Sequence, residues 1–326
     1  MMQSTRPYHI SVLVDEVLFY LAPQPYKIYV DVTFGGGGHT RAILQAEPTC
    51  RVIAIDWDQE AFLMHEQQFK DEFGDRITFI WGNFAQLALL LRKSPFVPSD
   101  FVREIGLPDR SLVRRRVSRE GEIDGILADF GTSQHQIFSD RGFSFSVDSP
   151  LDMRMSPAHQ KITAAHILNK TAEQDLVRIF KDYGQEPHAR AIARAVIAYR
   201  IQHLFKTTRQ LAELIEQQVP RHGSRIHPAT KVFQALRIAV NHELESIAHF
   251  LRQSTQVLAD GGRLVCISFH SLEDRLVKQF MHEHKKRPGV PGFELLTDGV
   301  VQATQEELAQ NPAARSAKLR AAQWSK

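Results

Sequence analysis

Hydrophobic runs alternate with helix-like segments along the first part of the chain. The runs cover residues 28–34, 51–56, 76–82 and 123–130, and amphipathic segments separate them. This alternation is typical of a parallel sheet whose strands are joined by crossover helices. Residues 94–120 interrupt the pattern with prolines and a cluster of arginines. We expect a surface insertion there, either an RNA contact or a plain loop.

Composition excludes several classes of protein. The chain has 326 residues, a formal net charge of +3 and two cysteines. This length excludes a single small module, and the composition is that of a globular protein. Cys50 and Cys266 lack the paired spacing of a disulfide framework or a cysteine zinc site, so we expect both to be buried. With no apolar run long enough to span a membrane and no signal-peptide core, we expect a soluble cytoplasmic protein.

Strand-like runs are missing between about residues 136 and 226, where amphipathic helices are predicted instead. One helix runs from about Ala172 to Gly184, which we expect to form a left-handed cap, and others follow Pro187 and Thr208. A long helix is then expected over 229–258.

Strand patterns return near the end of the chain, at 263–269, 293–296 and 318–324. The sequence therefore predicts an α/β protein with two domains. Residues 1–136 and 227–326 form a Rossmann-like sheet domain, and residues 137–226 form an inserted all-helical subdomain for substrate recognition.

The first hydrophobic run leads directly into four glycines, 35–38, followed by His39 and Thr40. Glycines at the carboxyl end of a strand let backbone N–H groups approach a ligand, and open α/β sheets bind ligands at that edge. The pattern predicts a nucleotide-like cofactor, although a tight turn without a ligand would look the same. Thr40 breaks the dinucleotide fingerprint and no P-loop lysine follows, which disfavours NAD and nucleoside triphosphates.

Acidic residues end two of the later runs. Asp56 is placed to accept hydrogen bonds from the two hydroxyls of a ribose. Together with the incomplete fingerprint, it favours S-adenosyl-L-methionine, which has a ribose and an adenine but no pyrophosphate. Phe84 lies either beside the adenine or in the core. Asp129 either serves catalysis or holds the methionine ammonium of the cofactor.

Several longer strings resemble a known family. In chain order they are HISVLVDEVL, YVDVTFGGGGHT, AIDWD, GNF, ILADFGTS, RGFSF, DSPLDMRM, HPATKVFQALRIAVNHELE, GGRLVCISFHSLEDR and NPAARSAKLR. From about His9 to Leu319 the chain resembles the MraW or RsmH family, bacterial methyltransferases of the N4 amine of a cytidine in small-subunit (16S) ribosomal RNA. The resemblance implies a class I methyltransferase fold with a helical insertion, S-adenosylmethionine as cofactor, and action near the decoding centre.

Carried over by position, the resemblance implies cofactor contacts at Gly37, Gly38, His39, Asp56, Phe84, Asp129 and Gln136. The chain departs from the family pattern at Gly36, Phe130, Thr132 and Gln134, and segment 94–120 is longer than usual. None of these departures removes a cofactor contact. Those at Phe130 and Gln134 concern the side of the methyl acceptor.

An exocyclic cytosine amine is a weak nucleophile because its lone pair is delocalised into the ring. We therefore expect catalysis to rest on positioning and on an oxygen that accepts one amine hydrogen, for which Asp129 is the best-placed carboxylate. The base must leave its stack to be reached. Phe143 and Phe145 are candidates to support it and His270 and Ser271 to contact it, with core packing and a supporting hydrogen bond as the alternatives.

Cations expected to follow RNA phosphates are Arg154, Arg190, Arg194 and the cluster at 114–119. No metal site is expected, because adjacent positions in His282-Glu283-His284 face different ways on a helix. The alternatives to a ribosomal RNA methyltransferase are an amino-methyltransferase of DNA or small molecules, a non-catalytic RNA-binding assembly factor and, more distantly, an NAD-dependent oxidoreductase. A homodimer is left open.

Overall fold

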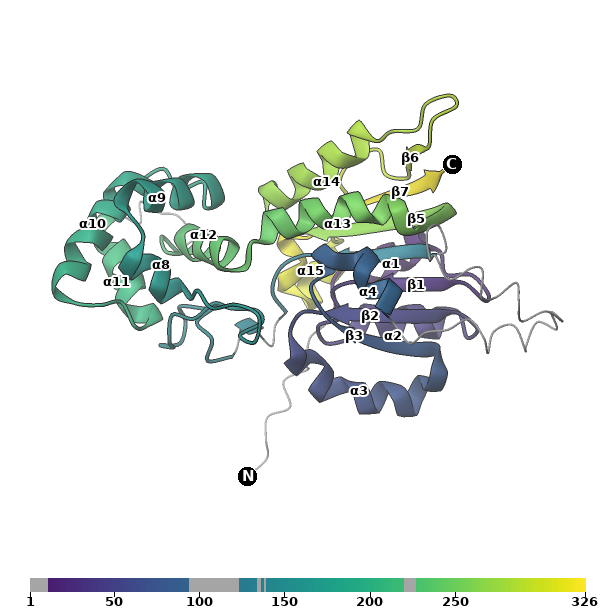
Figure 1. Ribbon diagram of the computed structural model, residues 1–326, viewed down its shortest axis with the longest axis horizontal. Coiled ribbons are helices and arrows are strands. Elements are labelled where there is room, and N and C mark those ends of the chain that lie inside the picture. Colours follow the sequence, from purple (N-terminus) through teal and green to yellow (C-terminus); the bar gives the residue numbers. More distant parts are fainter. Residues whose placement is uncertain (1–10, 94–122, 134–135, 138, 220–226) are drawn as a thin grey trace. The chain divides into compact units, whose positions relative to one another are not determined.

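The computed structural model describes residues 11–93, 123–133, 136–137, 139–219 and 227–326 (Figure 1). The chain divides into two compact units, the first made of Met1–Gly131 and Glu245–Lys326 and the second of Thr132–Leu244. The second unit extends past the predicted 137–226 because helix α12 (Thr230–Asn241) packs within it. The predicted insertion at 94–120 lies outside the described residues.

A seven-stranded sheet forms the centre of the first unit. Its strands are β1 (Ile28–Asp31), β2 (Arg51–Asp56), β3 (Ile77–Trp81), β4 (Ile123–Asp129), β5 (Leu258–Ser268), β6 (Gly292–Leu295) and β7 (Lys318–Ser325). Their order is β3-β2-β1-β4-β5-β7-β6; β7 runs antiparallel to both neighbours, and the other neighbouring pairs are parallel. The order 3-2-1-4-5 is that of doubly wound nucleotide-binding sheets, which confirms the predicted fold class.

Helices cover both faces of this sheet. One face packs against α4 (Leu87–Lys93), α13 (Glu243–Val257) and α14 (Ser271–Glu283), through buried side chains such as Leu91, Phe250 and Phe280. The other face packs against α1 (Val14–Leu21), α2 (Gly38–Ala46) and α3 (Gln59–Phe73), with α15 (Gln305–Gln310) and the short η4 (Pro312–Ser316). The short turns η1 (Gly74–Arg76) and η2 (Phe84–Gln86) flank β3. Cys50 and Cys266 are buried free thiols, as expected.

The second unit has a helical core of its own. It contains α8 (Ala164–Lys170), α9 (Glu173–Arg178), the π-helical turn η3 (Ile179–Tyr183), α10 (Ala189–Gln202), α11 (Thr208–Gln218) and α12. Gly184 does not form the predicted left-handed cap, because its φ is −93°. A Cβ on Gly184 would lie 2.5 Å from the carbonyl oxygen of Lys231, so the position is glycine because α12 approaches closely there.

The long helix predicted over 229–258 is wrong. His242 adopts a left-handed φ of 51° and separates α12 from α13. Asn241 fixes the break, because its Nδ2 donates to the carbonyl oxygen of Met153 and its Oδ1 accepts from the Met155 amide, both at 2.8 Å. No helix in the described part of the chain is long and apolar enough to cross a bilayer.

Candidate active site

Three adjacent strands of the sheet each end in an aspartate. Asp31 ends β1, Asp56 ends β2 and Asp129 ends β4, and these strands run parallel in the order β2-β1-β4. The three carboxylates therefore meet at one edge of the sheet, the edge where open α/β sheets bind ligands. The sequence predicted roles for Asp56 and Asp129 but missed Asp31, although it ends its strand in the same way.

Asp56 is held by the two loops that follow β1 and β2. Its Oδ2 accepts from the Gly35 amide and its Oδ1 from the Asp58 amide, each at 2.7 Å. Burial raises the pKa of Asp56 to about 7, against the opposing effect of these backbone hydrogen bonds. Each carboxylate oxygen retains a lone pair, so the side chain can still accept from two hydroxyls.

Asp31 is almost completely buried and is hydrogen-bonded to two threonines, of which Thr33 also links it to β4 and Thr40 lies on α2. The Thr40 hydroxyl donates to Asp31 Oδ2 at 2.7 Å, and the Thr33 amide donates to Oδ1 at 3.1 Å. The Thr33 hydroxyl in turn accepts from the Asp129 amide at 2.7 Å. Burial raises the pKa of Asp31, while His39 and the threonine hydrogen bonds oppose the shift.

One carboxylate oxygen of Asp129 has no hydrogen-bond donor among the residues that the structure describes. Its Oδ1 is buried and forms no hydrogen bond to any residue that the structure describes. Its Oδ2 lies 3.8 Å from His39 Nδ1. Burial raises the pKa of Asp129 to about 7; His39 opposes the shift, whereas the negative charges of Asp31 and Glu273 add to it. A buried acceptor without a donor is costly, which indicates that a ligand completes this site.

The glycine turn is shaped by packing inside the protein. Gly37 has a φ of 76°, and a Cβ on it would lie 2.4 Å from the Phe69 ring. A Cβ on Gly38 would lie 2.1 Å from Ser11 Oγ. The sequence argument held that these glycines leave room for a ligand. At Gly37 and Gly38, Phe69 and Ser11 fill the space that a side chain would need. These glycines therefore allow the turn to pack closely against the protein, which brings its backbone to the aspartate edge.

Comparisons with known proteins decide the family. The model of the MraW methylase family matches residues 6–325. The chain belongs to the MraW methylase family. It is a methyltransferase, and S-adenosyl-L-methionine is its cofactor, as the sequence predicted.

Relatives match the chain over nearly its whole length. A protein of Syntrophotalea carbinolica named "Ribosomal RNA small subunit methyltransferase H" is 43% identical, covering 96% of this chain and 96% of its own. One of the same name from Thermomicrobium roseum is 42% identical, covering 97% of this chain and 93% of its own. Among solved structures, an rRNA methylase from Streptococcus thermophilus matches with a TM-score of 0.37 and 13% identity, over 100% of both chains.

The aspartate edge of this MraW family methylase fits a cationic nucleoside. Burial disfavours the negative charges of Asp31, Asp56 and Asp129. S-adenosylmethionine brings a sulfonium and an ammonium group, which would offset that cost, and a ribose whose hydroxyls suit Asp56. The acceptor Oδ1 of Asp129 matches the same ligand, since it can take a hydrogen bond from an ammonium or an amine.

Phe84 and Gln136, two of the predicted cofactor contacts, also make contacts within the protein. The ring of Phe84 packs against Phe130 and Phe250, with centroids 5.9 Å and 5.7 Å away, and is partly exposed. Gln136 belongs to the second unit, where its Oε1 accepts from the Ser133 amide at 3.1 Å.

Other residues singled out from the sequence support structure. The Phe145 ring stacks on His227 at 4.5 Å, and both Phe143 and Phe145 pack on the core of the helical unit. Arg154 forms a bidentate ion pair with Asp152, with both contacts at 2.7 Å. Its expected contact with RNA phosphates stays a prediction.

The loop after β5 caps the start of α14 through hydrogen bonds. His270 caps the first turn of α14, and the buried Glu273 accepts from the Phe269 amide at 2.8 Å. His270 Nδ1 accepts from the Glu273 amide at 3.4 Å, and a contact of His270 or Ser271 with the base stays a prediction.

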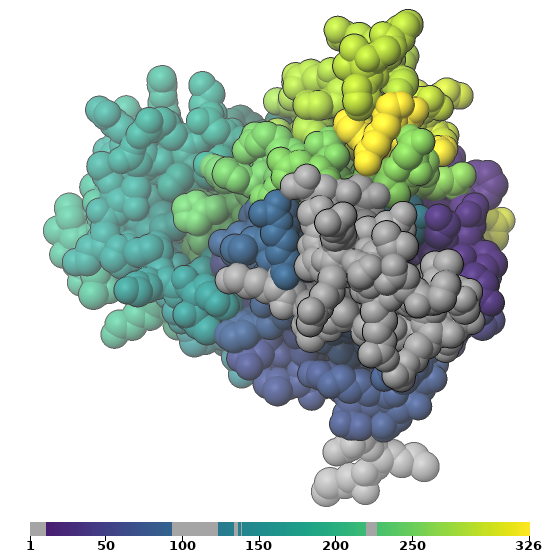
Figure 2. All heavy atoms as spheres, turned by 45° about the vertical axis from the view of Figure 1, so that its right-hand side comes forward, coloured from purple at the N-terminus to yellow at the C-terminus, as the bar shows by residue number. Residues whose placement is uncertain are grey.

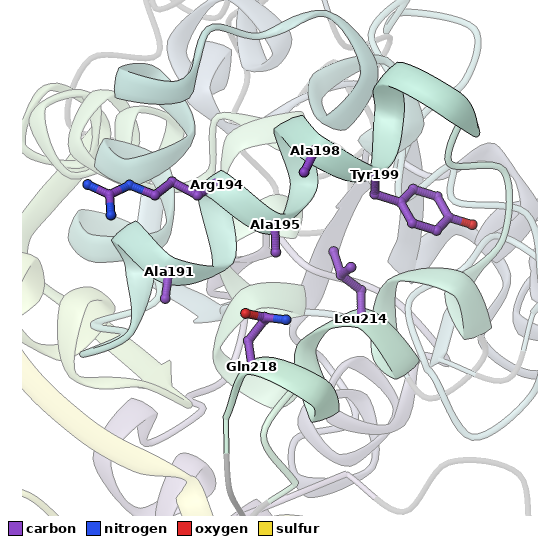
Figure 3. A pocket seen from close by; sticks show the side chains of 7 residues that line it. All are labelled: Ala191, Arg194, Ala195, Ala198, Tyr199, Leu214 and Gln218. Carbon is purple, nitrogen blue, oxygen red and sulfur yellow. The ribbon is translucent and has the colours of Figure 1, made fainter.

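The helical unit carries an open groove of about 580 Å³ between α10 and α11 (Figure 3). It is lined by Ala191, Arg194, Ala195, Ala198, Tyr199, Leu214 and Gln218. Arg194 is largely exposed and lies 3.6 Å from Glu173, a weak surface pairing. Arg190 is exposed on the same helix. Both arginines are thus accessible, in contrast to Arg154.

Proposed function

We propose that this MraW family methylase transfers the methyl group of S-adenosylmethionine to the N4 amine of a cytidine in small-subunit (16S) ribosomal RNA, near the decoding centre. The names of its relatives and the strings shared with the family support the substrate. The observation that carries the chemistry is Asp129 Oδ1, a buried acceptor without a donor among the described residues.

Asp129 would act on the acceptor amine. Its Oδ1 accepts a hydrogen bond from the N4 amine, which orients the nitrogen lone pair and takes up positive charge as the nitrogen–carbon bond forms. The new nitrogen–carbon bond would form as the methyl–sulfur bond of the cofactor breaks. A strong base is not needed, because the nitrogen then carries a full positive charge and loses its proton readily to the Asp129 carboxylate or to water. The task of this chain is to hold the reacting atoms in line, which makes positioning the main contribution.

The remaining site residues would hold the cofactor, whose sulfonium makes the methyl carbon electrophilic. We assign the ribose hydroxyls to Asp56 and the neighbouring backbone to Gly37, Gly38 and His39. The exposed part of the Phe84 ring and the Gln136 side chain are the further contacts that we assign to the cofactor.

The helical unit would recognise the substrate. Exposed Arg190 and Arg194 on α10 support this assignment, because arginine binds phosphate through a planar fork of donors. In this proposal the enzyme works in the cytoplasm on rRNA within the small ribosomal subunit, and a homodimer is compatible with it.

Transfer of labelled methyl groups from S-adenosylmethionine tests the substrate class. Small ribosomal subunits, naked 16S rRNA, DNA and free cytidine are compared as acceptors at equal cytidine concentration. The proposal predicts label in the rRNA of subunits and at least a hundredfold less in DNA and free cytidine. Preferential label in DNA or a small molecule, or cofactor binding without transfer to any acceptor, would replace it with one of the alternatives.

A further inference from the structure

The outer face of α14 and the turn that follows it carry a row of positive side chains. Arg275 and Lys278 lie on the helix, and Lys285 and Arg287 lie just after it; all four are exposed. We call these four residues the α14 cationic surface. It belongs entirely to the first unit and is separate from the arginines singled out in the sequence.

The inner face of α14 fixes the direction in which these side chains point. Val277, Phe280 and Met281 are buried in the core. Arg275 and Lys278 lie three residues apart, which places them on one face of α14 about one turn apart. These two cations therefore lie on the side of the helix that the sheet does not use, and Lys285 and Arg287 follow in the turn after it.

The turn after α14 is a built structure. The Val290 amide donates to the Arg287 carbonyl oxygen at 3.0 Å, with Pro288 next in the chain and Gly289 at a φ of 72°, which is the pattern of a type II turn. Its base is closed by a hydrogen bond of 2.7 Å from the Phe293 amide to the His284 carbonyl oxygen. In Figure 2 this segment, in yellow-green, stands out from the surface beside the yellow C-terminal strand.

Few negative charges offset this surface. Within the described part of the chain, none of its four cations forms an ion pair. Of the acids on α14 and β6, Glu283 and Glu294 are exposed, while Asp274 is held by Arg320 at 2.6 Å and Glu273 is buried. The positive charge is therefore available to an external anion.

The position of α14 relates this surface to the aspartate edge. Asp129 lies opposite Ile267 in the pairing of β4 with β5, and α14 starts at Ser271, a few residues further along the chain. The α14 cationic surface begins one turn into α14 and leads away from that edge. A strand whose target base sits at the aspartate edge could follow it.

We propose that the α14 cationic surface binds the sugar–phosphate backbone of the RNA strand that carries the target base. The inference rests on the proposed function. Four exposed cations on one helix and the turn that follows it suit the phosphates of an RNA strand. An anionic membrane is a poorer match, because Val290 is the main exposed apolar side chain that the turn offers for insertion.

The test compares two variants of the full-length protein that each lose three positive charges. The surface variant is Lys278→Ala/Lys285→Ala/Arg287→Ala, and the control variant is Lys27→Ala/Lys70→Ala/Arg315→Ala, from elsewhere on the first unit. Binding to a fragment of 16S rRNA that spans the decoding region is measured from 50 to 300 mM KCl. Methyl transfer is measured on small subunits and on a cytidine-containing pentanucleotide.

Each phosphate contact with a single strand contributes about 0.7 to the steepness of the plot of log affinity against log salt. The surface variant loses three cations, so we expect the magnitude of its slope to be smaller than that of the wild type by about 2. Its KM for small subunits should rise about tenfold, with kcat on the pentanucleotide within about twofold of the wild type. Equal slopes and KM values for the two variants would overturn the inference. So would loss of binding to phosphatidylglycerol vesicles with RNA binding retained.

The two proposals fail separately. One outcome is that the wild type methylates no ribosomal acceptor while the surface variant still binds RNA more weakly than the control variant does. The proposed function would then fall, and the RNA-binding surface would stand. If the wild type is active and the surface variant matches the control, the proposed function stands and this inference falls.

Discussion

His39 Nδ1 lies 3.8 Å from Asp129 Oδ2, and His39 Nε2 lies 2.8 Å from the Val12 carbonyl oxygen. A carbonyl oxygen only accepts, so Nε2 carries a hydrogen and donates it, and Nδ1 faces the carboxylate. The imidazole of His39, on α2, is thus held by the backbone of Val12, which precedes β1 in the chain. It is the group that most favours the ionised form of Asp129, against burial and the charges of Asp31 and Glu273.

The first prediction concerns the pH dependence of cofactor affinity. Burial raises the pKa values of Asp56 and Asp129 to about 7, so below that pH the free protein holds protons that a cationic ligand would displace. We expect the Kd for S-adenosylmethionine to increase by up to about tenfold as pH falls from 7 to 5.5, and to level off about one pH unit above 7.

Isothermal titration calorimetry in buffers of different ionisation enthalpy measures both this Kd and the protons released. S-adenosylhomocysteine, which lacks the sulfonium charge but keeps the amino and carboxyl groups, is the matched control and should show a weaker dependence. Identical pH profiles for the two ligands would contradict the electrostatic account.

Asp129→Asn should separate catalysis from binding. The amide keeps the shape of the side chain but removes its charge and weakens the acceptor, so we expect kcat to fall at least a hundredfold. The Kd for S-adenosylmethionine should change by less than about tenfold. A parallel loss of binding and transfer would make Asp129 a cofactor ligand first, and the catalytic assignment would lose its support.

Thr33→Val tests the link between β1 and β4. Valine has the same shape but cannot accept from the Asp129 amide, so a buried N–H loses its partner. We expect a loss of about 1–3 kcal/mol in the free energy of unfolding, measured by urea denaturation, and a lower kcat. Thr33→Ser keeps the hydroxyl and should recover most of both. Equal behaviour of the two variants would show that the hydroxyl does not matter.

Gly38→Ala tests why the turn contains glycine. The added Cβ would lie 2.1 Å from Ser11 Oγ and 3.1 Å from Ser11 Cβ, so overpacking should cost about 1–3 kcal/mol. Ser11→Gly removes both atoms, and the double variant should regain most of that loss in thermal denaturation. A double variant as unstable as the sum of the single variants would show that the collision with Ser11 is not the cause.

Periodicity was enough to predict the sheet. Each strand predicted from a hydrophobic run exists, because strands buried on both faces must be continuously apolar. Helix boundaries were harder to predict. The break at His242 depends on hydrogen bonds from Asn241 to a loop nearly ninety residues earlier, and no local pattern reports such a contact.

The hydrophobic runs that predict the strands also led to part of the site. Asp56 and Asp129 could be found because each lies at the end of a hydrophobic run, whereas Asp31 was overlooked because it lies in the middle of the run 28–34 and only the structure shows that β1 ends there. What the sequence cannot report is which oxygen remains without a donor. That depends on Thr33, Thr40 and His39 reaching the same edge from the loop and helix that follow β1.

Nucleoside analysis of the methylated product tests the central claim most directly. Small ribosomal subunits from cells that lack this activity are incubated with the enzyme and S-adenosylmethionine, and their rRNA is digested to nucleosides for mass spectrometry. The account predicts N4-methylcytidine at about one residue per subunit with the wild type and almost none with Asp129→Asn. Methylation at carbon 5 of cytosine, at a ribose hydroxyl or at another base would contradict it.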